Sequence, residues 1–129
     1  SLGGPNMIYG IGNDIIEIDR ISQAMDRNPR IVDKLFTDRE KKMLESKRFK
    51  PESLAGNFCA KEAVVKALGR GLRGFKIHDL EILRDELNKP YVVTSGDLKD
   101  MCISLGISQI MVTISHSKNY ATATAIALI

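Results

Sequence analysis

The sequence is poor in aromatic residues, with no tryptophan, three tyrosines and four phenylalanines. Proteins that bind single-stranded nucleic acid stack bases on aromatic side chains and carry a strong positive excess around them. The formal net charge here is only +3 at pH 7. We therefore expect no nucleic-acid partner.

Cysteine is also scarce, being limited to Cys59 and Cys102. This pair forms neither a metal-binding spacing nor a framework of disulfides. Both lie in apolar segments, so we predict small buried thiols in a protein of the reducing cytoplasm. No apolar run approaches the roughly 20 residues that span a bilayer, and we expect no membrane span.

Several motifs of familiar enzyme classes are missing. The glycine-rich stretch 70–75 has neither the Walker A spacing nor a G-x-G-x-x-G that opens a helix. No Ser-His-Asp order or Cys-His pairing indicates a covalent nucleophile on the protein. Without repeats or linkers, residues 7–129 are expected to form a single domain, and residues 1–6 to be an expression-tag remnant.

The hydrophobic patterning that is present predicts an α+β domain, with helices packed on a small, mainly antiparallel sheet. A first strand over residues 7–11 is expected to run into a loop at residues 12–14. Helices are predicted over residues 15–25, 30–36, 37 to 46–48, 51–69 and 96–105. Further strands are predicted within 77–84 and over 90–94, 109–115 and 120–128, the first two as a hairpin.

The helix that ends near Gly69 carries Glu62 and Lys66 one turn apart, opposite its apolar stripe. Such a pair is commonly a solvated ion pair that contributes only about 0.2–0.5 kcal/mol. Gly69 and Gly71 provide positions where a positive φ costs little.

Asp14 and His116 are both expected near strand ends, where side chains often serve a site. Each has a structural alternative, Asp14 as a helix cap or Asx turn and His116 as a packed histidine. Two carboxylates, Asp14 and Glu62, suit Mg²⁺, and Lys66 suits a phosphate oxygen. With the donors around His116, these are the parts that transfer of a phosphoryl-type group requires.

Positive charge gathers in the early part of the chain, at Arg20, Arg27, Arg30, Lys34 and Arg39. An acidic partner surface would match this cluster. The alternative is a solvated surface of mixed charge, because aspartates are interspersed among these residues.

Three motifs resemble the holo-acyl-carrier-protein synthases: MIYGIGNDIIEIDRI at 7–21, FCAKEAVVKALGRG at 58–71 and VTISHSKNYATA at 112–123. The resemblance covers Met7 to Ile129. It implies the 4′-phosphopantetheinyl transferase fold and Mg²⁺-dependent transfer of 4′-phosphopantetheine from coenzyme A to a serine of apo acyl carrier protein. Adenosine 3′,5′-bisphosphate would be released, and the reaction would support fatty acid biosynthesis.

Carried over residue by residue, the resemblance implies that Asp14 and Glu62 hold Mg²⁺ on the pyrophosphate of coenzyme A. Lys66 would contact the phosphates, with Lys61 nearby. The proton of the serine would pass to Glu62, directly or through water, although a metal-bound water or a nearby Asp is also possible.

The resemblance further implies that Gly69 and Gly71 let the backbone approach the ligand, and that Ser115 and His116 line the coenzyme pocket. It implies a homotrimer with sites shared between neighbouring subunits. The acidic recognition helix of the carrier protein would meet a basic surface made by Arg20, Arg27 and Arg30.

The chain departs from the family pattern at two positions. Asn57 stands where many members have Arg, and Arg70 stands where they have Thr between the two glycines. One hypothesis is that Arg70 supplies the displaced phosphate contact. Two other functions stay open on sequence alone: a binding module for acidic helices, and a Mg²⁺-dependent nucleotide hydrolase.

Overall fold

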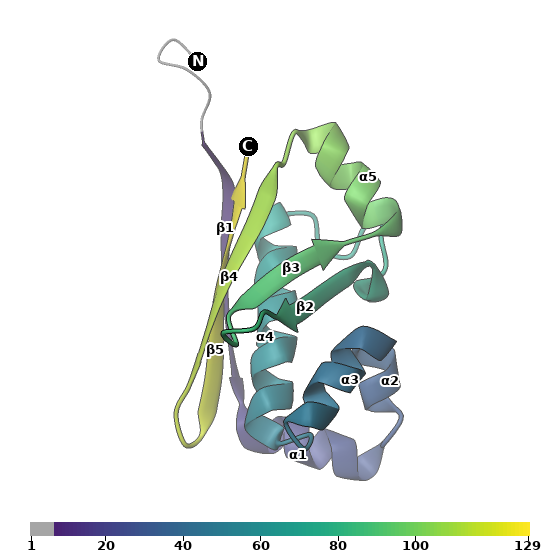
Figure 1. Cartoon of the computed structure of the whole chain (residues 1–129), viewed down its shortest axis with the longest axis vertical. Coiled ribbons are helices and arrows are strands. Elements are labelled where there is room, and N and C mark those ends of the chain that lie inside the picture. Colours follow the sequence, from purple (N-terminus) through teal and green to yellow (C-terminus); the bar gives the residue numbers. More distant parts are fainter. Residues whose placement is uncertain (1–6) are drawn as a thin grey trace.

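A computed structural model describes residues 7–129 of the protein; the predicted tag remnant at 1–6 lies outside the described residues. The chain forms β1 (Ile8–Glu17), α1 (Ile18–Arg27), α2 (Ile31–Leu35), α3 (Asp38–Ser46), α4 (Pro51–Leu68), the 3₁₀ turn η1 (Ile77–Asp79), β2 (Leu80–Arg84), β3 (Pro90–Thr94), α5 (Gly96–Leu105), β4 (Gln109–His116) and β5 (Tyr120–Leu128). This order confirms the predicted α+β class (Figure 1).

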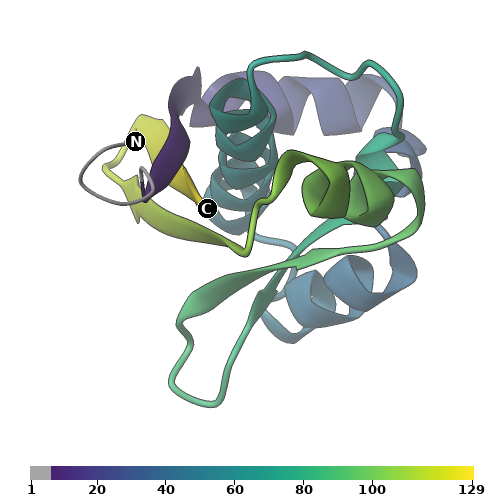
Figure 2. The ribbon, with the colours of Figure 1, turned by 90° about the horizontal axis from the view of Figure 1, so that it is seen from above.

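The strands form two antiparallel sheets, one of three strands in the order β1-β5-β4 and one made by the β2–β3 hairpin. Helix α4 packs against all three strands of the larger sheet and also against α1 and β2. Figure 2 looks down on α4 and shows the other elements arranged around it. The helix is therefore buried on most of its circumference, which its many small apolar residues permit.

Strand β1 continues through residues 12–14, where a loop was predicted. The glycines that suggested a loop serve close packing instead. A Cβ at Gly10 would lie 2.0 Å from the carbonyl oxygen of Ala67, and one at Gly12 would lie 2.0 Å from that of Ala63. Only glycine lets this strand approach the backbone of α4 so closely.

The register of the larger sheet sorts its side chains onto two faces. Asp14 and Ile114 both pair with Ala123 of β5, and the alternating alanines of β5 are buried against α4. The opposite face is uncovered in the single chain and carries Ile11, Ile15 and Met111, which are 67%, 63% and 44% exposed. Asp14 therefore lies within a strand, on the face toward α4, rather than beyond a strand end.

Three other predictions, of a hairpin, a capping box and buried thiols, are confirmed. The β2–β3 hairpin forms, and Thr37 and Glu40 make a reciprocal capping box at the start of α3. Cys59 and Cys102 are buried free thiols. Within residues 7–129, no helix has the length and apolar character needed to cross a bilayer.

Candidate active site

Asp14, Glu62 and Lys66 come together where β1 runs along α4. The Lys66 Nζ atom lies 3.0 Å from Asp14 Oδ1 and donates a second hydrogen bond, also 3.0 Å, to the carbonyl oxygen of Asn13. The ion pair of Lys66 is thus with Asp14, 52 positions away in the chain, rather than with Glu62 one turn before it. Strand β1 and helix α4 together build a site that neither carries alone.

The electrostatics of this cluster centre on Glu62. Burial raises the pKa of the Glu62 carboxyl, the negative charge of Asp14 raises it further, and the positive charge of Lys66 partly opposes this. Two carboxylates that repel each other in a partly desolvated place favour a proton or a cation between them. Among the described residues no cluster of three or more His, Cys, Asp or Glu side chains has metal-binding geometry, so Asp14 and Glu62 are the available acidic ligands here.

Cys59 lies beside the cluster but does not add a nucleophile. Burial, followed by the charges of Asp14 and Glu62, raises the pKa of its thiol to about 12. The Sγ atom donates to the carbonyl oxygen of Ala121. At neutral pH the thiol is therefore protonated and unreactive.

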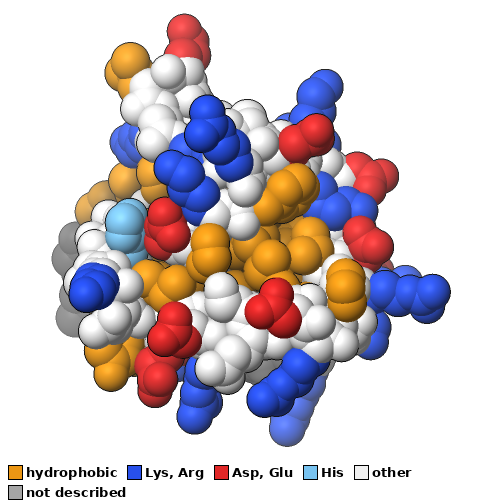
Figure 3. All heavy atoms as spheres, turned by 90° about the horizontal axis from the view of Figure 1, so that it is seen from below, with side chains coloured by type: hydrophobic (Ala, Val, Ile, Leu, Met, Phe, Trp, Pro, Cys, Tyr) orange, Lys and Arg blue, Asp and Glu red, His pale blue; other side chains and the backbone are white. Residues whose placement is uncertain are grey.

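His116 lies at the other edge of the same sheet. It ends β4 and lines a pocket with Lys47, Glu52 and Arg84, and it also borders an adjoining pocket that includes Arg48 and Lys50. Figure 3 shows lysine and arginine side chains gathered near a histidine on one end of the molecule.

Strand β5 separates this pocket from the Asp14 cluster. Because β1 and β4 are the two edges of the sheet, they lie two strand spacings apart, about 10 Å. Ser115 and His116 also point to opposite faces, since Ser115 pairs with Thr122 and His116 with the buried Ala121. A single chain therefore does not join Ser115, His116 and Asp14 into one site.

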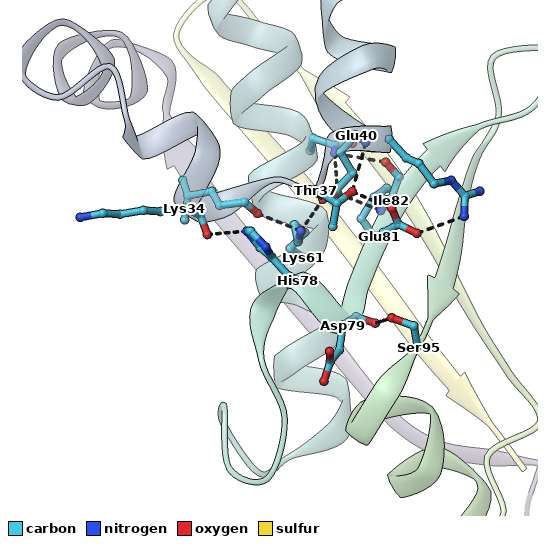
Figure 4. Close-up of polar contacts among 12 residues, drawn as sticks. Lys34, Thr37, Glu40, Lys61, His78, Asp79, Glu81, Ile82 and Ser95 are labelled. Atoms are coloured by element: carbon cyan, nitrogen blue, oxygen red, sulfur yellow. Dashed lines mark hydrogen bonds and ion pairs between the residues drawn. The ribbon is translucent and has the colours of Figure 1, made fainter.

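Lys61 is not placed as the resemblance implied. Its side chain is 0% exposed and forms an ion pair with Glu40, which is equally buried. The Nζ atom also donates to the carbonyl oxygen of Leu35 at 2.9 Å, as Figure 4 shows. The prediction that Lys61 lies near the coenzyme A phosphates does not fit this chain, because its side chain is buried and its charge neutralises a buried carboxylate.

The remaining oxygen of Glu40 connects three elements. Glu40 Oε2 accepts from the backbone N–H of Ile82 on β2 at 3.0 Å and from Nδ2 of Asn57 on α4 at 3.1 Å. Asn57 is itself 0% exposed. The sequence motif gave no sign of this network, because its partners lie on separate helices and a strand.

Gly69 and Gly71 adopt positive φ angles of 73° and 63°, and a Cβ at either would meet nothing within 4 Å in this chain. Arg70 lies between them, just beyond the end of α4. Asn57 is eleven residues before that end, or about 16 Å along the helix. Arg70 is therefore too distant to take over a contact made at position 57 of the same chain.

The three arginines of the predicted partner surface are exposed on α1 and in the turn that follows it. They are Arg20, Arg27 and Arg30. A small, largely enclosed apolar cavity lined by Ile21, Met25 and Val32 lies between α1 and α2. An apolar area bordered by charged side chains is visible on the face in Figure 3.

Comparisons with known proteins show which family the chain belongs to. The model of the 4′-phosphopantetheinyl transferase superfamily matches residues 10–125. A holo-[acyl-carrier-protein] synthase of Alkaliphilus oremlandii is 50% identical over 122 residues, which cover 95% of this chain and 100% of that one. The corresponding enzyme of Clostridium novyi is 47% identical, over 93% of this chain and 87% of that one.

Solved structures give the same result. The holo-[acyl-carrier-protein] synthase of Neisseria meningitidis has a TM-score of 0.87 at 30% identity, covering 94% of this chain and 98% of that one. The Helicobacter pylori enzyme, in complex with coenzyme A, has a TM-score of 0.81 at 28% identity and covers 91% and 98%.

The chain therefore belongs to the 4′-phosphopantetheinyl transferase superfamily. Within it, the chain is an enzyme of the holo-acyl-carrier-protein synthase type. The reaction of that type is transfer of phosphopantetheine from coenzyme A to apo acyl carrier protein. The resemblance and the fold predicted from the sequence motifs are confirmed.

Proposed function

We propose that this chain carries out that transfer at the Asp14–Glu62–Lys66 cluster, with Mg²⁺ and with a carrier serine as acceptor, in the cytoplasm and in support of fatty acid biosynthesis. The observation that carries the proposal is the meeting of two carboxylates and a lysine across β1 and α4. Relatives from Helicobacter pylori and Bacillus anthracis were solved in complex with coenzyme A.

The residues of the cluster fit Mg²⁺. This ion usually takes one or two protein carboxylates and fills its other positions with water and substrate phosphates. Asp14 and Glu62 supply two carboxylates, and burial followed by the charge of Asp14 raises the pKa of Glu62. A bound Mg²⁺ would supply positive charge beside the pyrophosphate of coenzyme A.

The chain's own groups then have defined tasks. Lys66 is half exposed, so its ammonium can turn from Asp14 to a phosphate oxygen. The serine oxygen forms a bond to the β-phosphorus of coenzyme A, and the bridging oxygen leaves with the electron pair on adenosine 3′,5′-bisphosphate. The serine proton passes to Glu62, directly or through water.

The anionic remainder of coenzyme A is proposed to bind at the His116 pocket. In one chain this pocket and the Asp14 cluster lie at opposite edges of the sheet. A complete site therefore needs two copies, each contributing one edge. The exposed Ile11, Ile15 and Met111 on the uncovered sheet face support such an assembly, and we propose a homotrimer.

The carrier protein is proposed to dock on the basic surface made by Arg20, Arg27 and Arg30. Opposite charge on the carrier would speed association and make it sensitive to salt.

The activity is tested by incubating the protein with apo carrier, coenzyme A and Mg²⁺, and weighing the carrier by mass spectrometry. A gain of one phosphopantetheine group is expected. No gain would refute the transferase proposal. Cleavage of coenzyme A without carrier would favour a hydrolase, and carrier binding without either reaction would favour a binding module.

A further inference from the structure

Arg84 is an unusual arginine in this chain because it is oriented but lacks an acidic partner. It ends β2, and its Nη1 atom donates to Asn57 Oδ1 at 3.0 Å and to the carbonyl oxygen of Leu83 at 3.3 Å. No carboxylate among the described residues lies within ion-pair distance of it. Its guanidinium therefore forms no ion pair within the chain.

The Glu40 carboxylate, whose charge acts on Arg84, is already occupied by other partners. Glu40 approaches from α3, but its two oxygens accept from Lys61, Thr37, Asn57 and Ile82. Burial lowers the pKa of Arg84 and the Glu40 carboxylate raises it, and an arginine in such a place stays protonated. Asn57 thus holds the positively charged guanidinium of Arg84 in place without neutralising its charge.

The free side of Arg84 faces the pocket of His116. Lys47, Glu52 and Asn88 also line this pocket, and Lys47 Nζ donates to Asn88 Oδ1 at 2.8 Å. No polar side-chain atom in residues 7–129 is both buried and without a partner. The other N–H groups of Arg84 are therefore accessible from the pocket.

We infer that Arg84, held in place by Asn57, binds a phosphate group of coenzyme A in the His116 pocket. A planar guanidinium with one N–H fixed by an amide presents the others in a fork that matches phosphate oxygens. Asn57 acts as a positioning residue. Asn57 carries no charge, and Arg84 on β2 thereby supplies a positive charge next to position 57.

This inference rests on the proposed function and is tested with steady-state kinetics. Arg84→Gln should raise the KM for coenzyme A by about tenfold or more, as expected for loss of a charge-assisted hydrogen bond, while the KM for apo carrier changes little. Lys99→Gln, which removes one positive charge from the exposed surface of α5, is the matched control and should leave both constants unchanged.

Kinetics with 3′-dephospho-coenzyme A as the substrate show which phosphate group Arg84 contacts. If Arg84 contacts the 3′-phosphate, Arg84→Gln will have little further effect with this substrate. If the effect persists, the contact is with the pyrophosphate. A folded Arg84→Gln variant whose KM for coenzyme A stays within twofold of wild type would overturn the inference.

The positioning role of Asn57 is tested by a double-mutant cycle. Asn57→Ala should raise the KM for coenzyme A with kcat largely retained, and adding it to Arg84→Gln should raise the KM no further. A purely structural role would instead lower Tm and leave the KM unchanged, which would contradict the positioning role.

Failure of this inference is distinguishable from failure of the proposed function. Binding of adenosine 3′,5′-bisphosphate, measured by calorimetry, does not require turnover. If Arg84 contacts either phosphate of this ligand, the wild-type protein should bind it at least about tenfold more tightly than Arg84→Gln does. Equal binding by both proteins, together with an unchanged KM for coenzyme A, would reject Arg84 as a phosphate ligand even if transfer activity is confirmed.

Discussion

Lys61 and Lys66 are five residues apart in α4 and lie in opposite surroundings. Lys61 is enclosed with Glu40 in the core, whereas Lys66 is about half exposed and pairs with Asp14. Removing one partner of a buried ion pair leaves the other charge buried and unpaired, which strongly destabilises the fold. A partly exposed ion pair contributes little to stability. Substituting Lys61 should therefore mainly reduce stability, whereas substituting Lys66 should mainly reduce activity.

The first prediction uses this contrast. Lys61→Met should lower the free energy of unfolding by about 3–5 kcal/mol, because the carboxylate of Glu40 is left buried and unpaired. Lys66→Met should change stability by less than about 1 kcal/mol but abolish most transfer. Urea denaturation and the carrier mass assay measure the two effects. A stable Lys61→Met protein would contradict the structural role.

The second prediction concerns Glu62. Because folding raises its pKa, the ionised form is disfavoured in the folded state, so the stability it contributes is present at low pH and is lost as pH rises through the folded pKa. Glu62→Gln should therefore have a higher Tm than wild type at pH 7. The difference in Tm between the two proteins should become smaller when the pH falls below 4.5, the ordinary pKa of a glutamate carboxyl.

The same variant should lose about a hundredfold or more in kcat, the usual contribution of a general base. Added Mg²⁺ should raise the Tm of wild type more than that of Glu62→Gln. Equal shifts, measured by differential scanning fluorimetry with Ca²⁺-free buffers, would argue against Glu62 as a metal ligand.

At the scale of elements, the decisive contact is between β1 and α4. The glycine pattern predicted a loop at residues 12–14, because glycine commonly ends strands. The structure shows that Gly10 and Gly12 make room for the backbone of α4. A sequence reveals that a position needs glycine, but not whether a turn or a neighbouring backbone imposes the need.

The third prediction tests this contact. Gly12→Ala should destabilise the fold by roughly 1–3 kcal/mol or more, because its Cβ would overlap the carbonyl oxygen of Ala63 at 2.0 Å. The forced shift of β1 should also move Asp14 from Glu62 and lower kcat.

Gly106→Ala is the control for this variant. Its φ is 74° and a Cβ there meets nothing within 4 Å, so it should cost only about 1 kcal/mol and leave kcat unchanged. Equal kcat values for the two variants would show that the close approach does not position Asp14.

Element by element, the sequence predicted most of the fold. Capping at Thr37 and Glu40, the hairpin and the helix ending at Gly69 were all confirmed, because local hydrogen bonding and periodicity determine them. The Glu40–Asn57–Arg84 connection was not predicted, since it depends on tertiary packing that brings α3, α4 and β2 together. Lys61 was misassigned because its resemblance to a motif said nothing of the environment inside the chain.

At the scale of the whole molecule, the two halves of the proposed site lie at different edges of one sheet. The uncovered face between them carries exposed Ile15. The assembly that we propose would bury this face and bring the edges of neighbouring copies together.

The fourth prediction follows from that arrangement. Ile15→Asp places a charge in the proposed interface and should yield monomers by light scattering, with transfer activity lost although each chain stays folded. Thr113→Asp would test the same face from β4, where Thr113 is exposed. An active monomer would refute the shared site.

Mixing experiments give a stricter test of the same prediction. Glu62→Gln and His116→Ala should each be nearly inactive alone. Mixed and allowed to exchange subunits, they should regain part of the activity, because some sites then combine an intact Asp14 edge with an intact His116 edge. No recovery in verified mixed oligomers would place both halves within one chain.

The separation of Asp14 and His116 by strand β5 also has a consequence for the cell. If catalysis needs two edges from two copies, specific activity depends on how much of the protein is present, and dilution below the dissociation constant of the assembly switches it off without any effector. The rate of carrier modification in the cell would then rise with gene dosage only above a threshold, rather than in proportion to it.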